Sequence, residues 1–259
     1  MRVLFIGDVV GSPGRQALRD TLPQLRDRHG ADLIVVNGEN SAGGVGVTER
    51  TANDLFGAGA DVITTGNHVY RHREAYDWLD REERVLRPAN YPQANPGRGH
   101  GVFEVQGARL RVVNLSGAVG LRVARSPFDT VDSILSHHEA DAVVVDFHAE
   151  VTSEKVAMGW HLDGRVGAVF GTHTHVPTAD GRVLPGGTAF VSDVGMTGSR
   201  HSVLGVKPEQ ALRSLITQMP TKFETAEDDV WVMGAVVELN QLGLADSFEQ
   251  VMVPAPAPD

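Results

Sequence analysis

Two histidines separated by one residue, His173 and His175, are the residues of this sequence best suited to holding a metal ion. They lie in the segment 171–175, directly after the apolar run Val166–Phe170, which predicts a buried strand. On an extended chain, side chains at i and i+2 point to the same side, so the two imidazoles can converge on one point. Neutral imidazole is the commonest transition-metal ligand among side chains. Taken alone, however, the pair is better explained as an exposed turn.

Further carboxylates, amides and histidines follow other apolar runs of the chain. Asp8 follows the run Val3–Ile6, and His148 follows a run at 142–145. The other residues in such positions are Glu39, Asn40, Asn67 and His68. Functional groups of an open α/β sheet gather outside the carboxyl ends of its strands, so one pocket can hold two carboxylates, two amides and four histidines. That is about twice what one cation uses, and it is sufficient for two metal ions sharing a bridging carboxylate.

Each of these residues also has a structural explanation. Asp8 can cap the helix that follows it. Glu39, Asn40 and Asn67 can be ordinary turn residues, and His148 can be a hydrogen-bonded histidine of the core. For any one residue the structural explanation is the commoner one. Their joint occurrence at successive strand ends favours the metal site.

The segments that carry these residues alternate between strands and helices. Strands are predicted at 3–6, 33–36 and 61–65, and they are followed by helices at 12–29, from Thr48 onward, and at 74–80. This alternation indicates βαβ units and a parallel sheet. In the first helix, Ser12 is expected to be the N-cap with Pro13 at the first helical position. Pro23 is expected to kink or break that helix.

After residue 88 the pattern changes to hairpins mixed with helices. The predicted elements are a hairpin at 101–115 turning at Gln106-Gly107, helices near 129–138, 152–162 and 207–217, a strand at 142–145 and a pair of strands around 230–252. No internal repeat or long linker divides the chain, so residues 1–253 are predicted to form a single α/β domain. Residues 254–259 form a Pro/Ala tail that is expected to be disordered.

Composition excludes several classes of function. The 259 residues carry a net charge of −10, which argues against non-specific binding to nucleic acid or anionic membranes. The chain has no cysteine, so thiolate metal sites and cysteine nucleophiles are excluded. No apolar run approaches the ~20 residues that a membrane span needs, and the short apolar start does not resemble a signal peptide. We therefore expect a cytoplasmic protein.

The strand-end motifs resemble those of the calcineurin-like metallophosphoesterase superfamily. Its members carry, in order, Asp-x-His, Gly-Asp, Gly-Asn-His, an isolated His and Gly-His-x-His. The matching pieces of this chain are Gly7-Asp8, Gly38-Glu39-Asn40, Gly66-Asn67-His68, His148 and Gly171-Thr172-His173-Thr174-His175. The resemblance implies a sandwich of two mixed β-sheets flanked by helices.

Three departures from the superfamily pattern narrow the resemblance to one branch of the superfamily. Val10 stands where the histidine of Asp-x-His is expected, Glu39 replaces the bridging aspartate, and Val69 replaces the acid after Gly-Asn-His. With the segment 193–198, these features are similar to the bacterial YmdB-type branch, whose members are di-iron or dimanganese cyclic-nucleotide phosphodiesterases. What orients His68, in the absence of that acid, is not given by the sequence.

The resemblance implies a role for each site residue. Metal one would be held by Asp8, Glu39, Asn40 and His175, and metal two by Glu39, Asn67, His148 and His173, with Glu39 bridging. Two cations ~3.5–4 Å apart can hold a hydroxide for in-line attack on a phosphate ester. His68 would protonate the departing oxygen as general acid. Iron or manganese is favoured, and zinc is compatible with the same donors.

The implied function is metal-dependent hydrolysis of cyclic nucleotides such as 2′,3′-cyclic AMP. The alternatives are a phosphomonoesterase, either nucleotidase or phosphoprotein phosphatase, that uses the same metals, and a regulatory protein that binds a nucleotide and turns over little. The expected partner is a small phosphate ester, with no membrane and no stable complex with long nucleic acid. A homo-oligomer is compatible with the sequence, which does not specify the oligomeric state.

Overall fold

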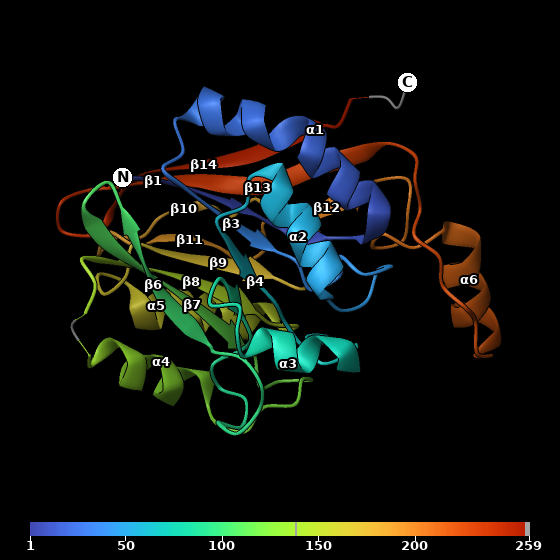
Figure 1. The fold of residues 1–259 in the computed structure, drawn as a ribbon, viewed down its shortest axis with the longest axis horizontal. Helices are drawn as coiled ribbons and strands as arrows, with labels where there is room; N and C mark the ends of the chain where they lie inside the picture. Colours follow the sequence, from blue (N-terminus) through green and yellow to red (C-terminus); the bar gives the residue numbers. More distant parts are fainter. Residues whose placement is uncertain (138, 257–259) are drawn as a thin grey trace.

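The computed structural model describes residues 1–137 and 139–256. Its two sheets are both mixed, with parallel and antiparallel pairs, as the predicted sandwich requires (Figure 1). The eight-stranded sheet has the order β2-β12-β13-β1-β3-β4-β5, with β14 paired to β13, and the six-stranded sheet has the order β10-β11-β9-β8-β7-β6. The predicted fold class is confirmed.

The strand bounds follow the apolar runs of the sequence. The larger sheet comprises β1 (Arg2–Ile6), β2 (Asp8–Val9), β3 (Leu33–Asn37), β4 (Val62–Thr64), β5 (Val85–Leu86), β12 (Met196–Ser199), β13 (Val230–Leu239) and β14 (Ala245–Pro254). The smaller sheet comprises β6 (His100–Val105), β7 (Ala108–Ser116), β8 (Ala142–His148), β9 (Ala168–Thr172), β10 (Arg182–Val183) and β11 (Ala189–Val191). In each sheet the strands that lead toward the predicted site run parallel, so their carboxyl ends lie at one edge.

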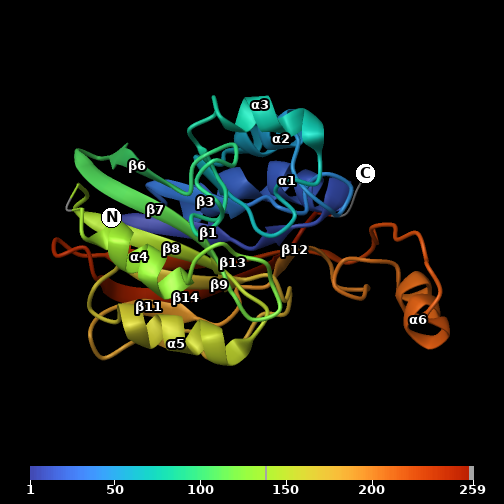
Figure 2. The same cartoon turned by 90° about the horizontal axis from the view of Figure 1, so that it is seen from below.

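Helices cover the outer faces of both sheets. The described helices are α1 (Gly11–His29), α2 (Glu49–Ala58), α3 (Tyr76–Leu79), α4 (Pro127–Leu135), α5 (Thr152–Leu162) and α6 (Pro208–Thr217). Figure 2 shows α1 and α2 on one side of the sandwich and α4 and α5 on the other. Between the sheets, the rings of Phe5 and Phe170 stack with centroids 4.6 Å apart. The apolar layer between the sheets thus fixes their relative position behind the site.

The first helix differs from its prediction in two respects. It begins at Gly11 with Val10 as the N-cap residue, so Ser12 is not the N-cap. It also continues through Pro23 without a break, because Leu18, Leu22 and Leu25 are buried against the sheet on both sides of the proline. Packing of this apolar face outweighs the loss of one hydrogen bond at the proline.

Other element bounds also differ from the predictions. The helix expected at 74–80 is a 3₁₀ turn at Arg73–Ala75 followed by the short α3. The α4 helix begins earlier, at Pro127, because Ser126 caps it by accepting a hydrogen bond from the Asp129 N–H.

At the C-terminus, β14 extends to Pro254 and the Ala255 N–H donates to the Val230 carbonyl at 2.8 Å. The tail therefore begins later than residue 254, and residues 257–259 of the predicted tail lie outside the described range.

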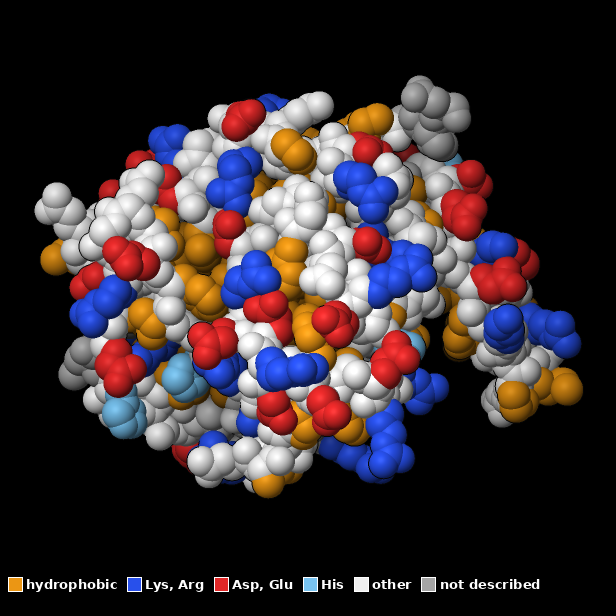
Figure 3. Space-filling model, in the orientation of Figure 1, with side chains coloured by type: hydrophobic (Ala, Val, Ile, Leu, Met, Phe, Trp, Pro, Cys, Tyr) orange, Lys and Arg blue, Asp and Glu red, His pale blue; other side chains and the backbone are white. Residues whose placement is uncertain are grey.

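The α6 helix projects away from the sandwich (Figures 1 and 2). Ala211 is its buried residue, while Leu212, Leu215 and Ile216 are exposed. Figure 3 shows hydrophobic side chains at the end of this projecting segment. Within the described ranges, no helix is both long enough and apolar enough to cross a bilayer.

Candidate metal centre

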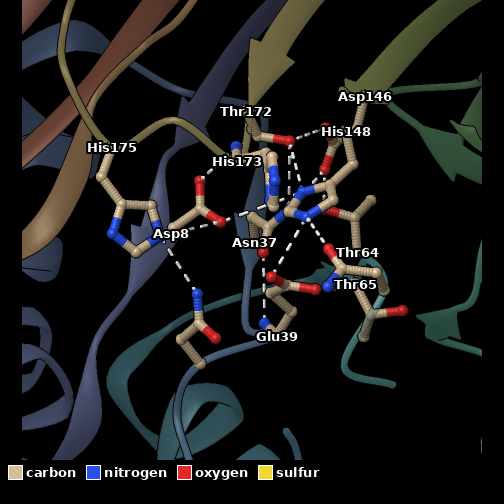
Figure 4. Close-up of polar contacts among 12 residues, drawn as sticks. Asp8, Asn37, Glu39, Thr64, Thr65, Asp146, His148, Thr172, His173 and His175 are labelled. Carbon is tan, nitrogen blue, oxygen red and sulfur yellow. Dashed lines mark hydrogen bonds and ion pairs between the residues drawn. The ribbon is translucent and has the colours of Figure 1, made fainter. Parts of the chain in front are cut away.

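All eight predicted site residues lie in one cluster at the carboxyl ends of strands from both sheets. Figure 4 shows Asp8, Glu39, His148, His173 and His175 of this cluster. Asp8 is the first residue of β2, next to β12, and His148 is the last residue of β8. The remaining members follow β3, β4 and β9 directly: Glu39 and Asn40, Asn67 and His68, and His173 and His175. The larger sheet thus supplies the carboxylates and amides, and the smaller sheet supplies three of the four histidines.

One part of the cluster is built around Asp8 and His175. The Nε2 atom of His175 lies 3.6 Å from Asp8 Oδ1 and 3.1 Å from Asn40 Nδ2. The Nδ1 atom of His175 lies 3.0 Å from the Leu204 carbonyl, which accepts a hydrogen bond from it and leaves Nε2 directed at the cluster. These three side chains belong to the predicted first metal set.

The other part of the cluster is built around His148. Its Nε2 lies 3.1 Å from Glu39 Oε1 and 3.1 Å from Asn67 Oδ1. The rings of His148 and His173 are 4.7 Å apart, and Glu39, His148 and His173 offer ligand atoms that all lie within 4.8 Å of one another. These side chains belong to the predicted second metal set, and the assignment of ligands remains a prediction.

The loop that carries His173 and His175 is not extended, contrary to the i, i+2 argument. The strand β9 ends at Thr172, and both histidines have positive φ angles, 94° and 64°. Such backbone conformations are costly for residues other than glycine and occur where surrounding contacts impose them. The backbone N–H of His173 donates to Asp8 Oδ2 at 3.1 Å, which turns the loop toward the cluster. The two histidines do converge, but through this turn.

A buried ion pair holds the same loop from behind. Lys155 and Asp193 are 2% and 1% exposed, and the Lys155 Nζ donates to Asp193 Oδ2 at 2.9 Å. The backbone N–H and the hydroxyl of Thr174 donate to the same oxygen at 3.1 and 2.6 Å. Thr174 lies between the two histidines, so this pair fixes the turn that presents them.

His68 is oriented by other members of the cluster. Its Nδ1 lies 3.0 Å from Asn40 Oδ1 and 3.3 Å from Glu39 Oε1, and its backbone N–H donates to Glu39 Oε2 at 3.2 Å. Both neighbours of Nδ1 are acceptors, so Nδ1 carries a proton, and no residue in the described part of the chain forms a hydrogen bond with Nε2. Val69, in the position of the missing acid, is fully buried in the core. The orienting group is therefore Asn40 with Glu39, which the sequence did not reveal.

The cluster combines buried carboxylates with two imidazoles of raised pKa, those of His148 and His175, and one of lowered pKa, that of His173, which burial and the neighbouring His148 depress. Burial alone would raise the pKa of Asp8, but His175 and His148 lower it. Burial would likewise raise the pKa of Glu39, but His148 and His68 hold it well below its usual value. Burial would lower the pKa of His148, but Glu39 and Asp8 raise it to about 9. The site therefore favours positive charge at its centre.

Two atoms of the cluster have surroundings that suit a bound cation. Among residues 1–137 and 139–256, none gives the buried Asp8 Oδ1 a hydrogen bond. His148 Nε2 faces two oxygens, those of Glu39 and Asn67, and these contacts are favourable only with a proton or a metal ion on that nitrogen. Oxygen and imidazole donors suit iron, manganese or zinc. The residues present thus fit a metal centre.

Gly66 leaves the space that this arrangement occupies. A Cβ at this position would lie 2.2 Å from His148 Nε2 and 2.3 Å from Glu39 Oε2. Contacts this short are not tolerated, so the residue before Asn67 must be glycine for the two side chains to meet. This steric requirement explains why the Gly-Asn-His motif begins with glycine.

Several residues of the site were missed by the sequence argument. Glu150 Oε2 lies 2.9 Å from His173 Nε2, and Glu150 follows His148 by two residues. A buried network of Asn37, Thr64, Asp146 and Thr172 lies behind His148. Asp146 has one signal in the sequence, because it precedes His148 by two residues on the same strand and so faces the same side.

Known proteins resemble this chain over nearly its whole length. The model of the YmdB-like protein family matches residues 4–251. The 2′,3′-cyclic-nucleotide 2′-phosphodiesterase of Bacillus subtilis (strain 168) is 41% identical over 256 residues, which cover 98% of this chain and 97% of that protein.

Solved structures agree with this match. A hypothetical protein of Thermus thermophilus is 41% identical with a TM-score of 0.94, covering 99% of this chain and 100% of that chain. A structure described as a novel phosphatase of Mycoplasma pneumoniae is 34% identical with a TM-score of 0.94, covering 100% of this chain and 95% of that chain. The NAD nucleotidase of Haemophilus influenzae shares the fold alone, at 13% identity and a TM-score of 0.63, over 98% of this chain and 56% of that chain. By its family match and these identities, this chain belongs to the YmdB-like protein family.

Proposed function

We propose that this chain is a metal-dependent phosphodiesterase that hydrolyses cyclic nucleotides of the 2′,3′ type. As a member of its family, the chain is a phosphoesterase-type hydrolase. The observation that carries the proposal is the buried cluster in which Asp8 Oδ1 has no hydrogen-bond partner within the described ranges and His148 Nε2 faces two oxygens. The substrate class is supported by the Bacillus subtilis relative, a 2′,3′-cyclic-nucleotide 2′-phosphodiesterase at 41% identity.

The proposed metal ligands divide into two sets that share Glu39. The first set is Asp8, Glu39, Asn40 and His175, and the second is Glu39, Asn67, His148 and His173. The division is supported by the contacts of His175 with Asp8 and Asn40, and of His148 with Glu39 and Asn67. When bound, the metal ions supply Lewis acidity and positive charge at the phosphoryl group. Iron or manganese is the expected metal, by resemblance to the YmdB-type branch, and zinc fits the same donors.

His68 is the proposed general acid. Its side chain is 36% exposed, whereas the side chains of Glu39 and His148 are buried, so it can reach a substrate from the side of the solvent. Asn40 and Glu39 hold Nδ1, which leaves Nε2 to carry the proton that is transferred. As the bond between phosphorus and the departing ribose oxygen breaks, His68 gives this proton to that oxygen.

A phosphomonoesterase is the second candidate. It is favoured by one comparison, the Mycoplasma pneumoniae structure described as a phosphatase, which matches with a TM-score of 0.94. The same cluster would serve both reactions, because the metals and His68 act on the phosphoryl group and its leaving oxygen in either ester.

The test compares a 2′,3′-cyclic nucleotide with the matched nucleoside monophosphate as substrates. Metal-stripped protein is refilled with manganese, and hydrolysis of each ester is measured alongside bound metal. Preference for the diester supports the proposal, while hydrolysis of the monoester alone supports the phosphatase. Absence of hydrolysis of either ester by fully loaded protein would contradict both and favour a nucleotide-binding regulatory role.

A further inference from the structure

Behind the metal cluster, a network of fully buried polar side chains joins the two sheets (Figure 4). Asn37 and Thr64 come from β3 and β4 of the larger sheet, and Asp146 and Thr172 come from β8 and β9 of the smaller sheet. Each of the four is at most 1% exposed. We propose that Asp146, at the centre of this network, is a positioning residue that orients His148 through Thr172 and Glu39 through Asn37. The inference rests on the proposed metal site.

The first arm of the network fixes the tautomer of His148. The Thr172 hydroxyl donates to Asp146 Oδ1 at 2.7 Å, and this uses its only proton. The His148 Nδ1, which lies 2.9 Å from the same hydroxyl oxygen, must therefore donate to it. A neutral His148 with its proton on Nδ1 presents a lone pair on Nε2, the atom that faces Glu39 and Asn67. Asp146 thus selects, through one hydroxyl, the tautomer that can bind a metal.

The second arm holds the proposed bridging residue. The Asn37 Nδ2 donates to Asp146 Oδ2 at 2.9 Å, and the backbone N–H of Glu39 donates to Asn37 Oδ1 at 3.1 Å. The amide of Asn37 is therefore fixed at both ends, with its donor on Asp146 and its acceptor on Glu39. The Thr64 hydroxyl also donates to Asp146 Oδ2, so three donors from three strands meet this carboxyl group.

The register of the strands explains why one carboxylate can reach both arms. Thr172 lies beside His148 in the β8–β9 pair, and Thr64 lies beside Asn37 in the β3–β4 pair. Asp146 and His148 alternate with Phe147 along β8, so both point toward the other sheet. The hydrogen bonds of Asp146 to Asn37 and Thr64 are thus contacts between the sheets, beside the ligands that each sheet contributes.

The decisive experiment measures manganese affinity, without substrate, by calorimetric titration of metal-stripped protein. Thr172→Val preserves the shape of the side chain but cannot accept from His148, and it should weaken manganese binding by about 10- to 100-fold, as loss of such outer partners typically does. Asp146→Asn should also weaken manganese binding. The double variant should lose less manganese-binding free energy than the sum of the losses in the two single variants, because both changes act through the same hydrogen-bond chain.

Two further variants separate positioning from general stability. Thr172→Ser retains the hydroxyl and should restore wild-type affinity. The control is Thr188→Val, which removes a hydroxyl that is as buried as that of Thr172 and donates to the Val166 carbonyl at 2.6 Å. This variant should lower thermal stability without changing manganese affinity.

The outcomes distinguish this inference from the proposed function. Manganese affinity of Thr172→Val equal to wild type, or reduced no more than in Thr188→Val, would contradict the inference alone. If Thr172→Val does not fold, unchanged affinity in Asp146→Asn contradicts it instead. Wild-type protein that binds no manganese would contradict the metal centre and the inference together, whereas wild-type protein that binds manganese but hydrolyses no ester contradicts only the proposed function.

Discussion

At the scale of single residues, His68 differs from His148 by its exposure and by the contacts of its ring nitrogens. One nitrogen of His68 is held by Asn40 and Glu39, and the other has no hydrogen bond to the residues that the structure describes. His148, by comparison, has both ring nitrogens occupied, by Thr172 on one side and by Glu39 and Asn67 on the other. This difference suits a proton donor at the first residue and a metal ligand at the second.

We therefore expect His68→Ala to reduce turnover and retain the metal. The loss of a general acid should lower kcat by ~10²–10⁴-fold, while bound manganese, measured by elemental analysis, stays at the wild-type level. His72→Ala is the matched control, because His72 lies four residues later and its Nε2 contacts the Val45 carbonyl at 2.8 Å. Equal loss of turnover and bound metal in His68→Ala would contradict the assigned role.

That these residues gather in one cluster was predictable from the sequence, but their individual contacts were not. Asp8, Glu39, Asn67 and His148 each follow a recognisable apolar run, and parallel strands bring such positions to one edge. The contact between His68 and Asn40 joins the segments that follow β3 and β4. It depends on the rotamers of both side chains, which residue spacing in the sequence does not determine.

At the scale of elements, the turn after β9 is the most demanding segment. His173 and His175 both have positive φ angles, and the turn is held by Asp8 on one side and by Asp193 with Lys155 on the other. The strand before this turn was predictable from its apolar run, whereas the conformation of the turn was not. Two non-glycine residues in that region are disfavoured locally, and tertiary contacts override the preference.

Removing the charge of Lys155 should test this support. In Lys155→Met, the carboxylate of Asp193 stays buried without its cation, which should destabilise the protein by ~3–5 kcal/mol. Chemical denaturation gives the free energy of unfolding. Lys207→Met is the control, because Lys207 contacts Glu224 at the same distance of 2.9 Å on the exposed surface, and little change is expected there. Equal destabilisation by the two substitutions would contradict the proposal that the Lys155–Asp193 pair stabilises the turn after β9.

Gly66, just after β4, gives a second test at this scale. Gly66→Ala should displace Glu39 or His148, since the added Cβ would lie 2.3 Å or less from an atom of each side chain. We expect loss of bound manganese and of activity, with the circular dichroism of the wild-type fold. Gly57→Ala in α2 is the control, because its Cβ would meet nothing within 4 Å and alanine favours a helix. Normal metal content in Gly66→Ala would refute the steric argument.

At the scale of the whole molecule, the site lies where two sheets meet. The apolar layer with Phe5 and Phe170 sets the distance between the sheets, and the cluster takes its groups from both of them. The resemblance of the strand-end motifs predicted this sandwich class correctly, whereas the alternation of strands and helices predicted only the parallel strands. The helix bounds, such as the start of α4 at Pro127, depend on capping contacts and could not be read from periodicity.

Because both sheets contribute groups, metal binding should stabilise the entire fold. At a free metal concentration of one hundred times Kd, a single site adds about 2.7 kcal/mol. For a chain of this size that corresponds to an increase in Tm of roughly 5–10 °C. Chelation should therefore lower Tm by this amount in differential scanning calorimetry. The Asp8→Asn variant should show a smaller change, and an unchanged wild-type Tm would contradict a metal centre shared by the sheets.

The central claim is that this cluster hydrolyses a phosphodiester when its metal ions are bound. The most direct measurement is the initial rate of 2′,3′-cyclic AMP hydrolysis while manganese is added stepwise to metal-stripped protein, with bound metal counted at each step. We expect no hydrolysis by stripped protein and a rate that rises until two manganese ions are bound per chain. Full hydrolysis by protein that remains free of metal, or none at full loading, would contradict the central claim.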